Sequence, residues 1–180
     1  MKKILFITVL FFSLASQAQV KKAVLQASGL TCSMCSNAIN KSLQSLDFVK
    51  KVEANIKNSS FEITFNPDQP VDFDKLKKKV EDAGFFVASL TATINFANIA
   101  LGNDTHIQVD GTTFHFLNTK DQVLNGERTI RLLDKGFVSA KEYKANGRYT
   151  MMACYKTGLA GACCSKEGPA VGKRIFHATI

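Results

Sequence analysis

The alternation of two hydrophobic periods between residues 22 and 90 constrains the fold of this chain more than any other feature. Apolar side chains recur at every second position, as in strands with one buried face, in residues 22–28, 49–56, 61–65 and 86–90. They recur every three to four positions, as on amphipathic helices, in residues 36–46 and 72–83. The predicted order is therefore βαββαβ, which gives an antiparallel four-stranded sheet with both helices on one face.

The second part of the chain, residues 91–180, is richer in strands. Asp110-Gly111 is a favourable two-residue hairpin turn, and residues 139–145 have the pattern of a short helix. Residues 156–172 contain four glycines and a proline, which indicates a loop. Strands are expected in residues 92–99, 105–109, 112–118, 128–133, 149–155 and 173–179. We expect a small, mostly-β domain, with an OB-like barrel as the candidate architecture.

The first 18 residues have the pattern of a secretory signal peptide. Lys2 and Lys3 precede an apolar run from Ile4 to Leu14, and Ala18 ends a stretch of small and polar residues. The run is too short for a membrane anchor, because a spanning helix needs roughly 20 apolar residues. We therefore expect cleavage near Ala18, export to the periplasm or the extracellular space, and no membrane span in the mature chain.

The charge pattern narrows the functional classes. Removal of the two lysines in the signal lowers the formal net charge from +8 to +6. The remaining basic residues are dispersed in small groups, which disfavours nucleic-acid binding. The sequence shows no Ser-His-Asp order, paired-carboxylate motif or phosphate-binding loop, so we expect a protein that is not an enzyme.

Cys32 and Cys35 have the spacing of a metal site in the first strand-to-helix loop. Thiolates select soft ions such as Cu(I) over Mg²⁺ or Ca²⁺. Zinc prefers four ligands, and no histidine lies nearby in sequence, so two-coordinate Cu(I) is favoured, with Hg(II), Zn(II) and Cd(II) as alternatives. We also expect the following helix to lower the pKa of Cys35, because Cys35 lies near the helix N-terminus.

Two segments carry a resemblance to a known family. Gly29-Leu30-Thr31-Cys32-Ser33-Met34-Cys35 is similar to the Gly-Met-Thr-Cys-x-x-Cys motif of the heavy-metal-associated domain, and Glu81-Asp82-Ala83-Gly84-Phe85 is similar to the turn that ends the family's second helix. This family includes copper chaperones, metal-binding domains of P-type ATPases and the periplasmic mercury carrier. The resemblance covers residues 22–90 and implies a ferredoxin-like fold, Cys32 and Cys35 as metal ligands, and Phe85 as a side chain that shields the metal loop. Leu30 stands where the family usually has a packing Met, and we expect little effect from this difference.

A second group of sulfur-containing residues lies in the second part, in Met151, Met152, Cys154, Cys163 and Cys164. Thioethers and thiolates suit Cu(I), so this group is a candidate second metal site. The alternative is a disulfide between Cys154 and either Cys163 or Cys164, which export favours. Such a bridge would stabilise the fold by about 2–4 kcal/mol. Because the chain has five cysteines, they do not all pair within one molecule.

The three histidines also lie in the second part. His177 accompanies the second cysteine group, whereas His106 and His115 are interpreted as surface or hydrogen-bonded residues rather than ligands.

These residues predict an exported soft-metal carrier or scavenger that binds Cu(I) on Cys32 and Cys35 and passes it on by ligand exchange. Its partner would be a metal-donor or metal-acceptor protein, and a dimer bridged by the metal is a further expectation. Two alternatives stay open: a thiol–disulfide redox protein that cycles the same pair, and a metal-regulated binding module whose main activity lies in the C-terminal domain. The expected organisation is a signal peptide at 1–18, a heavy-metal-associated domain at 19–90 and a β-rich domain at 91–180.

Overall fold

The computed structural model describes residues 18–180 except 31, 68 and 165–168, so the predicted signal peptide lies outside the described residues. Short 3₁₀ turns cover Ile56–Asn58, Gly147–Tyr149 and Ala162–Cys164. The remaining elements, in chain order, are β1 (Gln19–Ser28), α1 (Ser33–Gln44), β2 (Val49–Asn55), β3 (Ser60–Phe65), α2 (Phe73–Asp82), β4 (Phe86–Leu101), β5 (Thr105–Val109), β6 (Thr112–Phe116), β7 (Gln122–Leu132), α3 (Ala140–Asn146), α4 (Cys154–Thr157) and β8 (Ile175–Thr179).

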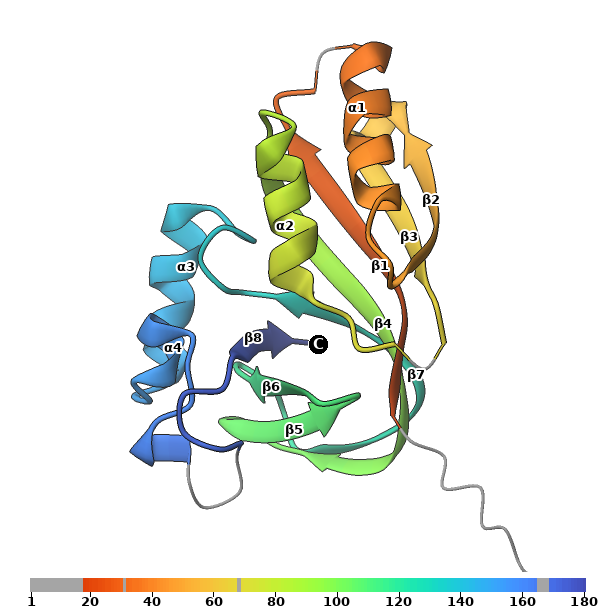
Figure 1. Cartoon of the computed structure of the whole chain (residues 1–180). Helices are drawn as coiled ribbons and strands as arrows, with labels where there is room; N and C mark the ends of the chain where they lie inside the picture. The colour runs from red at the N-terminus through yellow and green to blue at the C-terminus, as the bar shows by residue number, and fades with distance from the viewer. Residues whose placement is uncertain (1–17, 31, 68, 165–168) are drawn as a thin grey trace, which may run out of the picture.

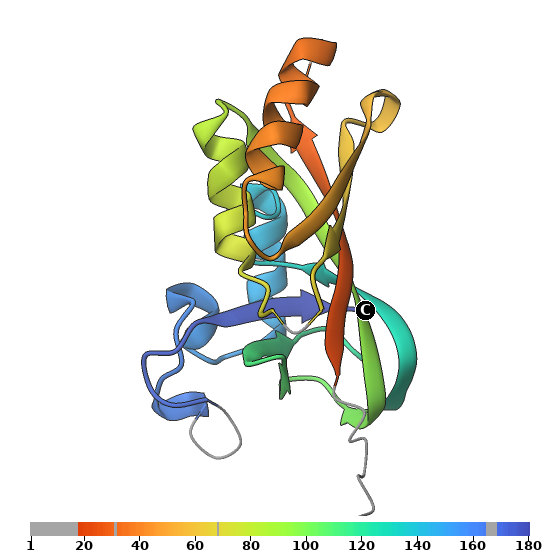
Figure 2. The ribbon, with the colours of Figure 1, turned by 45° about the vertical axis from the view of Figure 1, so that its right-hand side comes forward.

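The predicted βαββαβ order is confirmed. Strands β2, β3, β1 and β4 lie side by side in that order, and every pairing among them is antiparallel. Helices α1 and α2 cover the same face of these four strands (Figures 1 and 2). This is the ferredoxin-like arrangement that the hydrophobic periods predict.

Each of the two helices packs one apolar stripe against the sheet. Helix α1 buries Ile39 and Leu43, and α2 buries Leu76 and Val80. The Asp72 side chain caps α2 by accepting a hydrogen bond from the backbone N–H of Lys75 at 3.0 Å. The cap and the apolar stripe together fix where α2 begins and which face it buries.

The strands of the second part extend the same sheet and do not close into a barrel. Strand β4 continues to Leu101 and pairs with β1 on one side and with β7 on the other. The full order is β2-β3-β1-β4-β7-β8-β6-β5, with a parallel pair formed by β6 and β8. The expected mostly-β composition is confirmed, but the OB-like barrel is wrong. The long β4 offers a free edge to β7, and pairing there satisfies backbone groups that a separate barrel would have to pair elsewhere.

Local signals in the second part succeed at one position and fail at another. Asp110 and Gly111 have φ values of 47° and 74° between β5 and β6, as a type I′ hairpin turn requires. The strand expected in residues 149–155 is wrong, because this segment forms a 3₁₀ turn followed by the start of α4. Helix α3 is found where the short helix is expected.

The two parts of the chain share one hydrophobic core. Phe73 at the start of α2 lies edge-on to Phe114 of β6 and to Phe176 of β8, with ring centroids 5.9 and 5.3 Å apart. Next to it, Asp74 accepts hydrogen bonds from Arg174. The expected boundary between residues 90 and 91 falls inside β4, and the division into separate domains stays a prediction.

Replacing Phe73 with Leu is expected to lower the free energy of unfolding by about 1.5 kcal/mol, because a flat ring buried between two others is exchanged for a smaller, branched side chain. Denaturant unfolding followed by circular dichroism measures the change. Phe86→Leu is the matched control, since Phe86 is 70% exposed, and its expected effect is below about 0.5 kcal/mol. Equal effects of the two changes would contradict the shared core.

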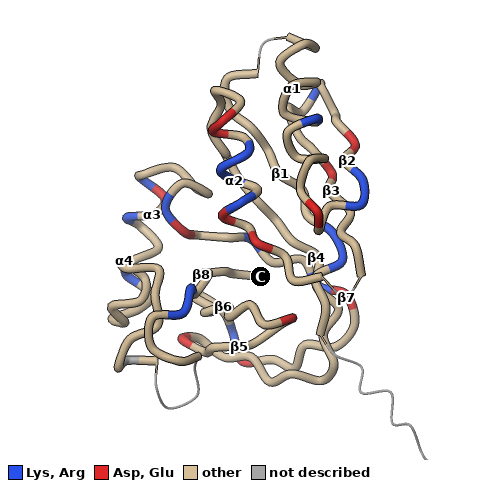
Figure 3. The backbone as a smooth tube through the Cα atoms, in the orientation of Figure 1, with Lys and Arg blue, Asp and Glu red and all other residues tan. Residues whose placement is uncertain are grey.

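Charged residues are spread over the molecule without a large region of one sign (Figure 3). On α2, for example, four lysines lie between the acidic residues Asp74 and Glu81. Over the described residues, no helix is long and apolar enough to cross a membrane.

Candidate metal-binding site

Cys32 and Cys35 lie at the junction of β1 and α1. Gly29 has a φ of 83°, a left-handed conformation that suits glycine and turns the chain out of the strand. Cys32 is extended, with a φ of −147°, and serves as the N-cap of α1, which begins at Ser33. Cys35 therefore sits in the first turn of the helix, on the same side as Cys32.

The two sulfur atoms are close enough to share one ion. The Sγ atoms of Cys32 and Cys35 lie 2.7 Å apart, and the backbone N–H of Cys35 donates to Cys32 Sγ at 3.3 Å. Cys32 is exposed and Cys35 is half-buried. The pair thus faces solvent at the tip of the molecule, where α1 begins (Figure 1).

The electrostatics favour a thiolate on Cys32. The hydrogen bond from the Cys35 side chain, followed by the backbone N–H of Cys35, lowers the pKa of Cys32 below its usual range. The same side-chain hydrogen bond raises the pKa of Cys35. The expectation that the helix lowers the pKa of Cys35 is therefore wrong. The residue that caps the helix is Cys32, and the pKa of Cys35 is raised first by its side-chain hydrogen bond with Cys32.

This asymmetry predicts a pH dependence of alkylation in the metal-free, reduced protein. Only the thiolate reacts with iodoacetamide. As the pH is raised from acid, Cys32 is expected to become alkylated at a lower pH than Cys35, because its pKa is lowered and that of Cys35 is raised. Peptide mass spectrometry at short reaction times measures the two sites separately. Preferential alkylation of Cys35 would contradict the assignment.

Apolar side chains surround the cysteine loop. Leu30 is half-buried against the core, as expected for the position where the family pattern has Met. Phe85 is also half-buried there, and its Cδ1 lies 3.9 Å from the point where a Cβ on Gly29 would be. Phe85 therefore lies beside the start of the loop, and its shielding role stays a prediction. Met34 and Phe86 are 82% and 70% exposed.

Comparison with known families decides what this half of the chain is. Residues 24–86 match the model of the heavy-metal-associated domain. They form a heavy-metal-associated domain. The match includes both cysteines and the turn at Phe85, and it confirms the resemblance that the two motifs carry. Residues 87–180 lie outside it.

Related proteins match only part of this chain. A probable copper-exporting P-type ATPase of Archaeoglobus fulgidus is 28% identical over 85 residues, which is 47% of this chain and 10% of the ATPase. A copper-transporting ATPase of Helicobacter pylori is 40% identical over 57 residues, which is 32% of this chain and 8% of the ATPase. Among solved structures, the yeast copper transporter domain CCC2A is 31% identical, covering 37% of this chain and 90% of that domain, with a TM-score of 0.34. The chain spans about a tenth of the length of these ATPases.

The second sulfur group lies outside the heavy-metal-associated domain, and its members are only partly brought together. Cys154 and Cys164 are buried in one cluster, and Met152 packs against it half-buried. Met151 is 99% exposed and is not part of that cluster. The side chain of Cys163 lies outside the described part of the chain. Both interpretations of this group, a metal site and a disulfide, stay predictions.

The structure brings Cys154 together with two histidines that the sequence interpretation set aside. The ligand atoms of His106, His115 and Cys154 all lie within 4.8 Å of one another. His115 is fully buried and hydrogen-bonded to Asp104, so it is a satisfied histidine in that respect. Burial, followed by the neighbouring His106 and His177, lowers the pKa of His115 to about 4. The hairpin turn at Asp110-Gly111 was the available signal, because a two-residue turn there places residues 106 and 115 opposite each other.

Proposed function

We propose that this protein is an exported carrier that binds one Cu(I) ion between Cys32 and Cys35 and hands it to a partner by thiolate exchange. The observation that carries the proposal is the pair of sulfur atoms 2.7 Å apart on the solvent-facing start of α1. Movement of each sulfur by a small side-chain rotation opens the pair around an ion. Soft thiolates hold Cu(I) in preference to hard cations.

Copper in the monovalent state is the best match to this donor set. Among the described residues, no cluster of three or more His, Cys, Asp or Glu ligands includes Cys32 or Cys35. Two donors suit a monovalent soft ion, whereas Zn(II) requires two more. The names of the ATPase and yeast relatives, which are copper transporters, support the same choice. Hg(II) and Cd(II) are the competitors that share the preference for thiolate.

The surface around the loop supports transfer to another protein. Residues 29–40 carry no charged side chain, and the exposed Met34 lies between the two cysteines. Phe86, also exposed, pairs in β1–β4 with Ser28, which directly precedes the loop. An apolar rim around exposed thiolates allows a partner to approach closely and to offer its own thiolate to the bound ion. The proposal that the protein is exported is supported by the signal-peptide pattern of residues 1–18.

Metal exchange between two copies of the mature chain tests the carrier function. Unlabelled protein loaded with one Cu(I) is mixed with apo protein labelled with ¹⁵N, and the amide signals of residues 32–36 in the labelled copy report arrival of the metal. Transfer is expected within the mixing time, and Met34→Glu is expected to slow it without changing the Cu(I) stoichiometry. Exchange no faster than release to a small-molecule chelator would contradict a carrier. A stable dimer in the mixture would instead support the metal-bridged form.

A thiol–disulfide redox function is the second candidate, and the closeness of the two sulfur atoms favours it. Reduction of insulin by the metal-free protein distinguishes the two functions. The carrier is expected to show no turnover, and turnover that disappears in Cys32→Ser would establish the redox protein. A metal-regulated activity in residues 91–180 is the remaining alternative, and it predicts a conformational change there when Cu(I) binds the first site.

A further inference from the structure

We propose that His106, His115 and Cys154 form a second metal site, which binds a thiophilic d¹⁰ ion, Cu(I) or Zn(II), in the second half of the chain. The three ligand atoms lie within 4.8 Å of one another. They come from three separate elements, β5, β6 and α4. Two imidazoles and a thiol form a donor set that both copper and zinc accept in proteins.

The distances need little adjustment to hold an ion. Cys154 Sγ lies 3.5 Å from His115 Nδ1. Metal–sulfur bonds of about 2.3 Å and metal–nitrogen bonds of about 2.0–2.1 Å place neighbouring ligands about 3.5 Å apart in a tetrahedral site. The rings of His106 and His115 stack with centroids 4.3 Å apart and an interplanar angle of 14°. Because the two rings are nearly parallel, His106 must rotate its side chain for its nitrogen to face the same ion.

A carboxylate orients one of the two histidines. Asp104 Oδ1 lies 2.8 Å from His115 Nε2. This contact places the proton on Nε2, as the donor to Asp104, and leaves the Nδ1 lone pair directed at Cys154. A carboxylate behind a ligating imidazole is the usual second partner of protein metal sites, and it fixes both the tautomer and the ring orientation.

The site is enclosed by the fold. His115 is 0% exposed and Cys154 is 1% exposed, while His106 is half-buried. Cys154 shares its buried cluster with Cys164 and the half-buried Met152. Three donors satisfy Cu(I), whereas Zn(II) needs a fourth. Cys164, which shares the buried cluster of Cys154, is a candidate for that fourth ligand.

An ion at this position would link two parts of the structure. The described residues of 147–174 form short helical turns and an isolated bridge from Leu159 to Arg174. Strands β5 and β6 form the hairpin at the outer edge of the sheet. Cys154 lies in residues 147–174 and contacts His115 of the hairpin. A metal bound between them would hold this segment against the hairpin. The proposal does not depend on the function of Cys32 and Cys35.

The test uses the reduced mature chain with both Cys32→Ser and Cys35→Ser, so that binding at the first site is absent. Co(II), as the optical stand-in for Zn(II), and Cu(I), in competition with a chromogenic chelator, are titrated separately. One equivalent of at least one ion is expected to bind, with Co(II) giving a thiolate charge-transfer absorption. The ion that binds more tightly, Cu(I) or Co(II) in place of Zn(II), identifies the metal that the site prefers. Failure of both arms would overturn the second site while leaving the carrier function untouched.

Further substitutions in the same background locate the site. Cys154→Ser is expected to abolish binding, and His106→Gln to weaken it at least about tenfold, since loss of an outer partner alone costs about 10–100-fold. Asp104→Asn is expected to weaken metal binding by about 10–100-fold, because His115 loses its hydrogen-bond partner. Met151→Ala, which changes an exposed methionine, is expected to leave the affinity unchanged. If circular dichroism shows that Cys154→Ser does not fold, the affinity of His106→Gln is used to test the site instead. Binding that is unchanged in His106→Gln, or a Cys154 disulfide found by peptide mapping of natively purified protein, would overturn the proposal.

Discussion

Simultaneous replacement of Cys32 and Cys35 by Ser is expected to remove one equivalent of bound Cu(I) from the reduced mature protein. Each single replacement is expected to weaken that equivalent by at least about a hundredfold, because the loss of a ligand exceeds the 10–100-fold effect of losing an outer partner. The physical reason is that a serine hydroxyl is a hard donor, whereas Cu(I) prefers thiolate. Copper content after gel filtration gives the stoichiometry, and chelator competition gives the affinity.

Ser33→Ala is the matched control for the cysteine replacements. Ser33 lies between the two cysteines at the first position of α1 and is exposed, so its replacement perturbs the loop without removing a thiol. It is expected to leave the stoichiometry and the affinity unchanged. An equal copper content in the parent and in the double cysteine variant would mean that the tightest copper is held elsewhere.

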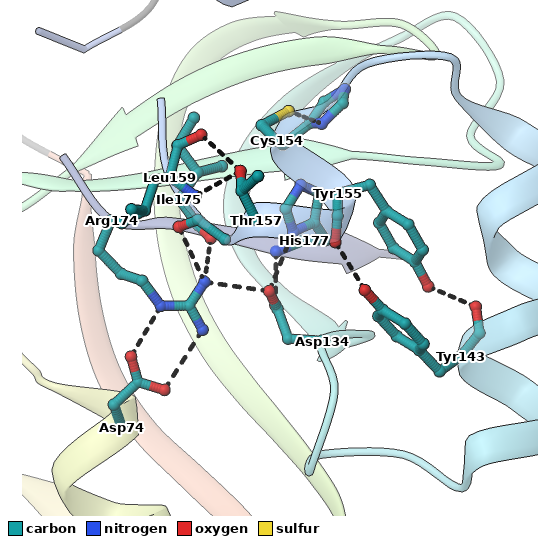
Figure 4. Close-up of polar contacts among 12 residues, drawn as sticks. Asp74, Asp134, Tyr143, Cys154, Tyr155, Thr157, Leu159, Arg174, Ile175 and His177 are labelled. Carbon is teal, nitrogen blue, oxygen red and sulfur yellow. Dashed lines mark hydrogen bonds and ion pairs between the residues drawn. The ribbon is translucent and has the colours of Figure 1, made fainter. Parts of the chain in front are cut away.

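Replacement of Asp134 by Ala is expected to lower the free energy of unfolding by about 3 kcal/mol, because two buried donors of His177 lose their acceptor at about 1–3 kcal/mol each. Asp134 is buried and lies between Arg174 and His177 (Figure 4). Its Oδ1 accepts from Arg174 at 3.1 Å and from His177 Nδ1 at 3.0 Å, and its Oδ2 accepts from the backbone N–H of His177 at 2.7 Å. Alanine would leave the buried donors of His177 without an acceptor. Urea unfolding measures the loss.

Asp74→Ala is the control for Asp134, because both carboxylates bind the same guanidinium group. Asp74 Oδ2 lies 2.7 Å from Arg174 Nε, but the Asp74 side chain is 42% exposed. A solvent-exposed ion pair contributes about 1 kcal/mol or less, so the expected loss is small. Asp134→Asn, which keeps one acceptor oxygen, is expected to fall between the two alanine variants. Equal losses at Asp74 and Asp134 would show that burial of Asp134 does not set its contribution.

The N-terminal half could be predicted from the sequence because its signals are local and agree with one another. The strand and helix periods, the Asp72 cap and the Cys32–Cys35 spacing each act within a few residues, and the structure brings them together as expected. The pKa assignment failed within this same region. It depended on which cysteine caps α1, and helix boundaries are the least certain part of a prediction from sequence.

The second half could not be predicted in the same way because its organisation depends on distant pairing. The parallel pairing of β6 with β8 joins residues about 60 apart, and hydrophobic periods within either strand do not specify a partner. Residues 149–155 are mostly apolar, as in a strand, but Met151 is exposed and the segment turns into α4. Here the tertiary arrangement overrides the local pattern.

The histidines show how a local signal and a distant one combine. A two-residue turn at Asp110-Gly111 implies that residues 106 and 115 face each other, a consequence that the sequence interpretation did not draw and that the structure shows. The arrival of Cys154 beside them depends on the path of residues 117–153, which no local pattern specifies. A residue pair predicted from a turn thus becomes a candidate site only when a third, distant donor is placed against it.

X-ray absorption at the copper edge tests whether Cys32 and Cys35 hold the ion, using the reduced mature protein loaded with one equivalent of Cu(I). The copper is expected to have two sulfur neighbours, from Cys32 and Cys35, and no nitrogen neighbour. A shell that contains imidazole nitrogen, or one unchanged in the variant that carries Ser at both positions 32 and 35, would contradict it, because the first copper would then bind away from the start of α1.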